Sequence, residues 1–166
     1  MIRTAFDSDD LDALMSVAGV SQFLFTYTDL FPANSQYEEY LHEAQKRGSQ
    51  DVILIDRALG DPTGKATIAD VEAGAMTADE LPAWFEDRDG IEYLTVYCDQ
   101  SNLAACEIAY PRPHWRWLAD LDGQWYLPGF RALHRPALLQ VASAAETGVD
   151  CDASLIFNDN WHPAKG

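Results

Sequence analysis

The sequence predicts an α/β protein, a compact TIM-like β/α barrel with missing helices after the later strands. Eight segments have the composition of strands, and the first five alternate with helical segments. Alternation of this kind predicts parallel pairing through right-handed crossovers, and eight such strands predict a closed barrel. A full barrel usually takes about 250 residues, whereas this chain has 166, so several outer helices must be missing. An open doubly wound sheet is the alternative for this length.

The first strand–helix unit begins at the N-terminus. Ile2–Phe6 is a short apolar run, and the pair Asp7-Ser8 behind it is suited to capping a helix. Apolar residues then recur at helical spacing from Leu11 to Ala18, and Gly19 ends the pattern. Val20–Tyr27 is rich in β-branched and aromatic residues and predicts the second strand.

The second helix follows a turn and has its own start signal. Ser35–Glu38 is a capping box, and the helix that it opens is predicted to end near Arg47-Gly48. Asp51–Ile55 predicts the third strand and Lys65–Asp70 the fourth, with Leu59–Gly64 as the turn between them.

A second capping box, Thr77–Glu80, opens a helix that is predicted to end near Asp89-Gly90. Ile91–Cys98 alternates between apolar and polar residues and predicts the fifth strand. Asp99–Ser101 then cap a short helix, which Pro111 stops.

The pattern changes in the last third of the chain. Trp115–Ala119, Ala137–Ala142 and Val149–Phe157 each resemble strands, and no convincing amphipathic helix lies between them. Because no linker or change of composition interrupts the chain, we expect residues 1–166 to form a single domain.

Composition excludes several classes of function. The chain has 27 acidic and 11 basic residues and a formal net charge of −16, which opposes binding to nucleic acid or to an anionic membrane surface. Met1–Asp10 has no apolar core, so we expect no signal peptide and a cytoplasmic location on synthesis. The three cysteines lack zinc-like spacing, and their number fits a reducing compartment. Cys98 is predicted to be a core residue.

Two carboxylates on the fourth strand are the sharpest chemical feature. Asp70 and Glu72 are two residues apart, so their side chains project from one face with Cβ atoms about 6–7 Å apart. If that face is the barrel interior near its C-terminal rim, one pKa rises and a protonated acid stands beside an ionised carboxylate. Glycoside hydrolysis uses this division of labour.

Other acids are placed to join this pair. Asp7 follows the first strand and Asp152 lies in the last, and strand ends that are distant in sequence converge at one mouth of a barrel. Asp150 competes with Asp152, because alternate residues of a strand face the same way. Asp7 has an alternative role as a cap of the first helix, and Asp99 is expected to cap the helix behind it.

We expect no metal and no cofactor. The histidines (His42, His114, His134 and His162) lack the spacing of zinc ligands. The acidic runs do not fit a calcium loop, and no glycine-rich phosphate loop follows a strand.

From about Lys65 to Trp161 the sequence resembles the glycoside hydrolase family 25 lysozymes, and in particular their short actinobacterial and phage branch. The matching segments are an apolar strand ending in Asp-x-Glu, a strand ending in Tyr, a Trp-x-Ala strand, a Gln-Val pair where the family has Gln-Tyr, and a last strand with a central Asp. In this chain they are Ala66–Glu72, Thr95–Tyr97, Trp117–Ala119, Gln140-Val141 and Cys151–Ser154.

The resemblance implies a barrel that cleaves the β-1,4 bond between N-acetylmuramic acid and N-acetylglucosamine with retention of configuration. Glu72 would be the general acid/base, and Asp70 would orient the substrate's 2-acetamido group, which attacks the anomeric carbon. Asp7 and Asp152 would line the sugar subsite and tune the other two acids. The implied wall of the subsite consists of Tyr97, Trp117 and Gln140.

The implied partner is the peptidoglycan glycan strand, reached as an endolysin released through a phage pore or as a protein carried on a virion beside other phage proteins. The alternative is a catalytically weak or inactive barrel that serves as a virion, decoration or binding protein. The net charge of −16, Val141 in place of Tyr and Leu121 in place of an aromatic favour that alternative. A third possibility is a barrel that acts on another amide-bearing glycan.

Overall fold

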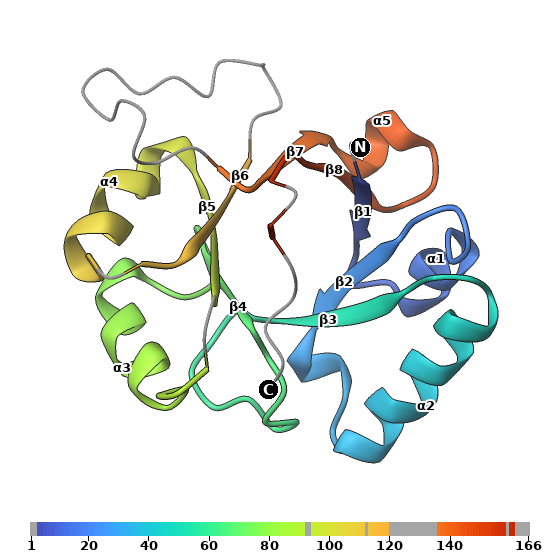
Figure 1. Cartoon of the computed structure of the whole chain (residues 1–166), viewed down its shortest axis with the longest axis horizontal. Coiled ribbons are helices and arrows are strands. Elements are labelled where there is room, and N and C mark those ends of the chain that lie inside the picture. Colours follow the sequence, from blue (N-terminus) through green and yellow to red (C-terminus); the bar gives the residue numbers. More distant parts are fainter. Residues whose placement is uncertain (1–2, 92–93, 112, 120–135, 159, 162–166) are drawn as a thin grey trace.

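The computed structural model describes residues 3–91, 94–111, 113–119, 136–158 and 160–161. Within these residues, eight strands follow one another around a closed barrel (Figure 1). This confirms the predicted barrel and excludes the open sheet. The strands are β1 (Arg3–Asp7), β2 (Phe23–Tyr27), β3 (Asp51–Asp56), β4 (Ile68–Val71), β5 (Thr95–Asp99), β6 (Trp115–Ala119), β7 (Leu138–Ala142) and β8 (Asp152–Ile156).

The larger helices lie outside the ring of strands (Figure 1). They are α1 (Leu11–Ser16), α2 (Asn34–Lys46), α3 (Leu81–Glu86) and α4 (Gln100–Ala109), with short 3-10 turns η1 (Thr28–Leu30) and η2 (Ala78–Glu80) and a single-turn helix α5 (Ala144–Thr147). Among the residues that the structure describes, the four larger helices therefore all precede β6, as predicted. Of the individual residues discussed above, Met1, Ile2, Leu121, His134 and His162 lie outside the described residues, as do residues 92–93 of the predicted fifth strand.

Strand direction departs from the prediction at one place. Strands β1 to β7 pair in parallel, but β8 runs antiparallel to both of its neighbours, β7 and β1. Parallel neighbours need a long crossover, whereas antiparallel neighbours need only a short connection, and residues 143–151 provide a short one. The reversal places the first residue of β8, Asp152, opposite Asp7, the last residue of β1.

Three helix starts differ from the sequence pattern. Asp10, rather than Asp7-Ser8, caps α1 by accepting from the N–H groups of Asp12 and Ala13. Helix α2 begins after Ala33 without a side-chain cap, so Ser35–Glu38 does not act as its capping box. Helix α5 was not predicted, although Ser143 and Glu146 form its capping box.

The other predicted caps are present. Thr77 and Glu80 form a capping box, which opens η2 immediately before α3. Asp99 accepts from the N–H of Asn102 and caps α4. Both arrangements satisfy backbone donors that a helix start otherwise leaves unpaired.

The barrel interior is apolar and tightly filled toward the amino ends of β1 to β7. Phe25 packs edge-on against Trp117 and Trp161, and Trp161 also meets Phe23 in a T-shaped contact. The indole of Trp161 donates to Thr95 Oγ1 at 3.3 Å. The interior core consists of Ala5, Phe23, Phe25, Ile53, Ile55, Ile68, Trp117, Ala137, Leu138, Ile156 and Trp161.

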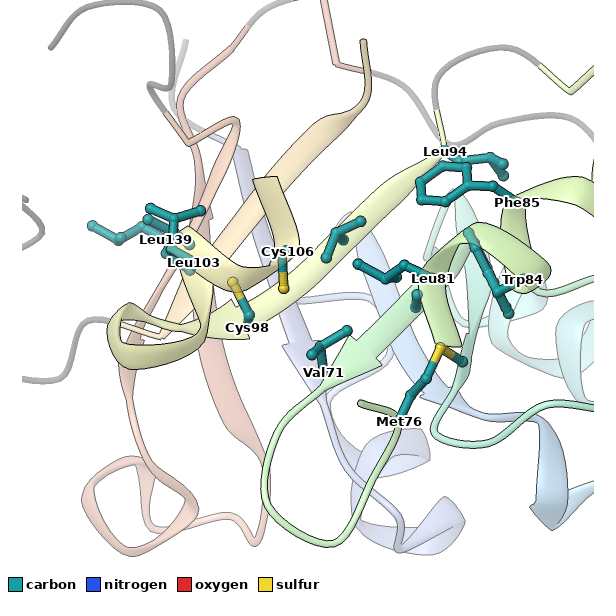
Figure 2. Close-up of a cluster of buried hydrophobic side chains, with 13 residues drawn as sticks. Val71, Met76, Leu81, Trp84, Phe85, Leu94, Cys98, Leu103, Cys106 and Leu139 are labelled. Atoms are coloured by element: carbon teal, nitrogen blue, oxygen red, sulfur yellow. The ribbon is translucent and has the colours of Figure 1, made fainter. Parts of the chain in front are cut away.

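A second apolar cluster lies outside the sheet, between β4, β5 and the helices α3 and α4 (Figure 2). Leu81 and Trp84 from α3 pack there with Val71 of β4. Cys98 and Cys106 are buried in the same cluster, so the prediction that Cys98 is a core residue is confirmed. Among the described residues, no helix has the length and apolar character needed to cross a membrane.

Candidate active site

Alternating residues of each strand face the barrel interior, and these residues become polar toward the carboxyl ends of β1, β4, β5 and β7. On β1, Ala5 of the core is followed two residues later by Asp7, and on β4 Ile68 is followed by Asp70. We call this end of the barrel the mouth. Because β8 is reversed, its first residue, Asp152, also lies at the mouth.

The structure brings the four predicted acids together at the mouth. Asp7 and Asp152 occupy directly opposed positions on β1 and β8. Asp70 lies in β4, and Glu72 follows that strand directly. Burial raises the pKa of Asp7 well above its usual value, and the charges of Asp152, Asp70 and Glu72 raise it further. All four carboxyl groups therefore share one electrostatic environment.

Asp70 is the most deeply buried member of this group, with 1% of its surface exposed. Burial, and then the charge of Glu72, raise its pKa to about 8, although Arg57 acts in the opposite direction. Among the described residues, none donates a hydrogen bond to Oδ1 of Asp70 or of Asp7. Both atoms thus keep acceptor capacity inside a poorly solvated site.

Glu72 is only half-buried, in keeping with its place just beyond the end of β4. Burial raises its pKa, as do the charges of Asp99 and Asp152, and Arg57 lowers it. This carboxyl group therefore holds its proton more tightly than an ordinary glutamate does, while it remains accessible from the mouth. Asp99 therefore influences the site in addition to capping α4.

A chain of hydrogen bonds links the predicted wall residues to Asp152. The hydroxyl of Tyr97 donates to Gln140 Oε1 at 2.5 Å, and Gln140 Nε2 donates to Asp152 Oδ2. The backbone N–H of Ala144, the first residue of α5, donates to Asp152 Oδ1 at 2.5 Å. Burial raises the pKa of Asp152, while the bonds from Ala144 and Gln140 lower it. The small helix α5 thus orients the last acid.

Trp117 lies deeper than a residue of an open subsite wall would. Its ring is 1% exposed and packs edge-on against Tyr97, with ring centroids 4.6 Å apart. Its indole N–H donates to Ser154 Oγ at 2.9 Å. In this structure Trp117 supports Tyr97 from within the core, and direct stacking of Trp117 on a sugar stays a prediction.

The competition between the two acids near the last strand is resolved by position. Asp150 precedes β8, is exposed and has a positive φ of 21°. Its carbonyl accepts from Ser8 Oγ at 2.8 Å. Asp152, in contrast, is part of β8 and reaches the mouth.

Two residues of the mouth were missed by the sequence analysis. Tyr27 ends β2 on the interior face, and burial, followed by the charges of Asp70 and Asp7, raises its pKa. Arg57 directly follows β3, and its guanidinium lies 4.0 Å from the centre of the Tyr27 ring. The position of Tyr27 at a strand end was a usable signal. For Arg57 the only signal was that it directly follows a strand.

Other described features lie apart from the mouth. A cavity of about 610 Å³ is bounded by Phe85, Leu94 and Tyr110, beside the amino ends of β5 and β6, and none of the predicted site residues borders it. Within the described part of the chain, no group of three or more His, Cys, Asp or Glu side chains is arranged to hold a metal ion.

Neither a family model nor a curated protein sequence matches this chain. Its structure, in contrast, is similar to several solved proteins. A glycoside hydrolase family 25 lysozyme from Aspergillus fumigatus has a TM-score of 0.58 at 12% identity, with 96% of each chain covered. The catalytic domain of an endolysin from a bacteriophage of Listeria monocytogenes has a TM-score of 0.59 at 12% identity, with 96% of this chain and 95% of the other covered.

A family 25 glycosyl hydrolase from Bacillus anthracis has a TM-score of 0.55 at 12% identity, with 95% of this chain and 90% of the other covered. These likenesses extend over nearly the whole barrel, but at such low identity they concern the fold alone. The chain therefore adopts the barrel fold of the glycoside hydrolase family 25 lysozymes.

Proposed function

We propose that this protein is a muramidase that hydrolyses the β-1,4 bond between N-acetylmuramic acid and N-acetylglucosamine in peptidoglycan. The observation that carries the proposal is the convergence of Asp7, Asp70, Glu72 and Asp152 at one mouth, where each has a raised pKa. The likeness of the fold to lysozymes and an endolysin supports the same function. In this proposal residues 1–166 act as a single catalytic domain.

In the proposed mechanism Glu72 is the general acid. It donates its proton to the glycosidic oxygen as the bond to the anomeric carbon breaks. The carbonyl oxygen of the substrate's 2-acetamido group attacks that carbon from the opposite face and forms a cyclic oxazolinium intermediate. The Glu72 carboxylate then takes a proton from water, whose oxygen opens the ring, and the product retains the original configuration.

Asp70 holds the acetamido group through its N–H. In the free protein the pair of Asp70 and Glu72 keeps a proton mainly on Asp70, since the pKa of Asp70 is about 8. An N–H donor facing Asp70 favours its ionised form, so binding of substrate shifts the shared proton toward Glu72. The unpartnered Oδ1 of Asp70 is an acceptor suited to that N–H.

The test is clearance of a turbid suspension of bacterial cell walls, including actinobacterial walls, between about pH 4 and 7. The wild-type protein is expected to clear the suspension and to release new reducing ends with muramic acid at the terminus. Glu72→Gln is expected to abolish clearance while the circular dichroism spectrum stays unchanged. Glu39→Gln, on the exposed face of α2, is the matched control for the loss of one negative charge.

A second candidate function is a non-catalytic barrel carried on a phage particle or used for binding. The net charge of −16, which repels an anionic wall polymer, favours it. Absence of clearance on several wall types, together with binding to walls or virion proteins, would support this second function. New reducing ends from a different glycan with acetamido groups would instead indicate another substrate.

If the protein is a muramidase used as an endolysin, it reaches the wall from inside the infected cell. If it is carried on a virion, it reaches the wall from outside. Detection of the protein in purified particles, or only in infected cells before lysis, separates these two routes.

A further inference from the structure

Arg57 is held rigidly beside the acids of the mouth. Its Nε and Nη2 atoms donate to the two oxygens of Asp29 at 3.2 and 3.1 Å, a bidentate arrangement. The face of the guanidinium rests on the Tyr27 ring, with 4.0 Å between Cζ and the ring centre. A guanidinium that is bonded along one edge and packed on one face is oriented before a ligand arrives.

The remaining edge of the guanidinium can still donate hydrogen bonds. Of its five N–H groups, two are donated to Asp29. Nη1 is 3.8 Å from Asp9 Oδ2, which is an ion-pair distance and too long for a hydrogen bond. The side chain of Arg57 is 32% exposed, so a ligand can reach it from solvent.

The charges around the mouth explain why such an edge is useful. Asp7, Asp70, Glu72 and Asp152 make the mouth strongly acidic, and a substrate that carries a carboxylate would be repelled there. Arg57 is close enough to Asp70 and Glu72 for its charge to lower the pKa of both. It is therefore a cation within reach of the space where a glycan would lie.

We propose that Arg57 is a specificity-determining residue of this site, whose Nη1 edge, ion-paired with Asp9 but not hydrogen-bonded to it, binds a carboxylate of the glycan substrate. This inference rests on the proposed function. The carboxylate belongs either to the lactyl ether of N-acetylmuramic acid or to the stem peptide attached to it. Tyr27 and Asp29 hold the guanidinium in the plane that a carboxylate requires.

Three substrates distinguish the sources of the carboxylate. The first is wall glycan that retains its stem peptides, the second is the same glycan after an amidase has freed the lactyl carboxylates, and the third is an uncharged oligomer of N-acetylglucosamine. Arg57→Gln is expected to lower kcat/KM about 10- to 100-fold on the carboxylate-bearing glycan, mainly through KM, because a hydrogen bond to a charged group is lost. On the uncharged oligomer we expect less than about a threefold change.

The controls separate recognition from other effects of Arg57. Because Arg57 also influences Asp70 and Glu72, each variant is measured at its own pH optimum. Arg47→Gln, at the exposed end of α2, matches the loss of one positive charge, and Arg57→Lys keeps the charge but loses the planar fork. Arg57→Lys is expected to give an intermediate KM on the carboxylate-bearing glycan, and it also serves if Arg57→Gln does not fold.

Equal loss on all three substrates, with a pH profile displaced to higher pH, would overturn the inference and leave Arg57 as a residue that acts only on Asp70 and Glu72. Binding of the same glycans to Glu72→Gln, with and without Arg57→Gln, is measured by calorimetry. If the wild type cleaves nothing but this binding still depends on Arg57 and on the carboxylate, the muramidase proposal fails and the recognition by Arg57 stands. Equal binding affinity with and without Arg57→Gln would refute the recognition of the carboxylate by Arg57.

Discussion

Asp70 shows how a single side chain links stability to chemistry at the mouth. Its carboxyl group is almost completely removed from water, and Oδ1 has no donor among the described residues. Such an arrangement costs free energy in the folded state, and its pKa of about 8 reflects that cost. Replacement of such a group is expected to stabilise the protein, and the group is expected to be retained because the function needs it.

Asp70→Asn is expected to be more stable than the wild type at pH 8 and about as stable as the wild type at pH 4. The ordinary pKa of Asp is 3.8 and the folded value is about 8. Between these values the folded protein keeps a proton that the unfolded chain has released, so the wild-type free energy of unfolding falls as pH rises.

Urea unfolding at pH 4, 6 and 8 measures this effect. The variant is expected to gain about 1–3 kcal/mol at pH 8, the usual cost of a buried polar group without a partner, and almost nothing at pH 4. Asp89→Asn, on the surface, is the control for the loss of one negative charge. A gain that is the same at all three pH values would contradict the burial of an ionisable Asp70.

At the scale of secondary-structure elements, a buried carboxylate joins β3 to α3 and to the segment that follows α3. Asp56, the last residue of β3, faces outward and is 0% exposed. It accepts from Arg88 Nη2 at 2.5 Å, from the indole of Trp84 at 2.8 Å and from Thr28 Oγ1 at 2.7 Å. Arg88 also donates to the carbonyls of Ala66 and Trp84. These bonds hold α3 against the barrel close to the mouth.

Asp56→Ala is expected to destabilise the protein by about 3–5 kcal/mol, because it removes the hydrogen-bonded partner of the nearly buried Arg88 guanidinium and leaves only Asp61, 3.7 Å away, as a carboxylate neighbour. Chemical denaturation measures the loss. The double variant Asp56→Leu with Arg88→Met removes both charges and is expected to recover a part of it, since apolar replacements of a buried pair are often tolerated. A single variant as stable as the wild type would show that the pair contributes nothing.

The elements that sequence patterns predicted well are those with local signals. The capping box of Thr77 and Glu80 and the cap at Asp99 were found from residues three apart in the sequence, although the same spacing at Ser35–Glu38 does not form a cap. The direction of β8 was not predicted, since a pattern of period two sets which side chains share a face and not which way the strand runs. Helix α5 was missed because one turn carries too few residues for a periodic signal.

At the scale of the whole molecule, the closed barrel and the four converging acids followed from counting strands and placing acids at their ends. The partners of these acids could not be predicted in that way. Arg57 reaches the mouth only through its contacts with Tyr27 and Asp29, and Gln140 bonds Asp152 across the β7–β8 pair. Such contacts depend on side-chain conformations that a linear pattern does not contain.

The net charge of −16 predicts an unusual response to salt. If the protein acts on walls, repulsion from the anionic polymer is strongest at low ionic strength, where the screening length is about 30 Å at 0.01 M compared with about 8 Å at 0.15 M. The rate of wall clearance is therefore expected to rise several-fold between these conditions. Cleavage of an uncharged oligomer is expected to stay nearly constant. A clearance rate that falls with added salt would show that attraction, and not repulsion, governs the approach.

The contact between Arg3 and the end of the described chain has a practical consequence. Arg3 donates to the carbonyls of Asn158 and Trp161 at 2.9 and 2.7 Å, and Trp161 packs on Phe23, the first residue of β2. Both ends of the described polypeptide thus meet at the pole opposite the acids. A fluorescent label attached on this side of the barrel would lie away from the acids, and access for a glycan would stay open.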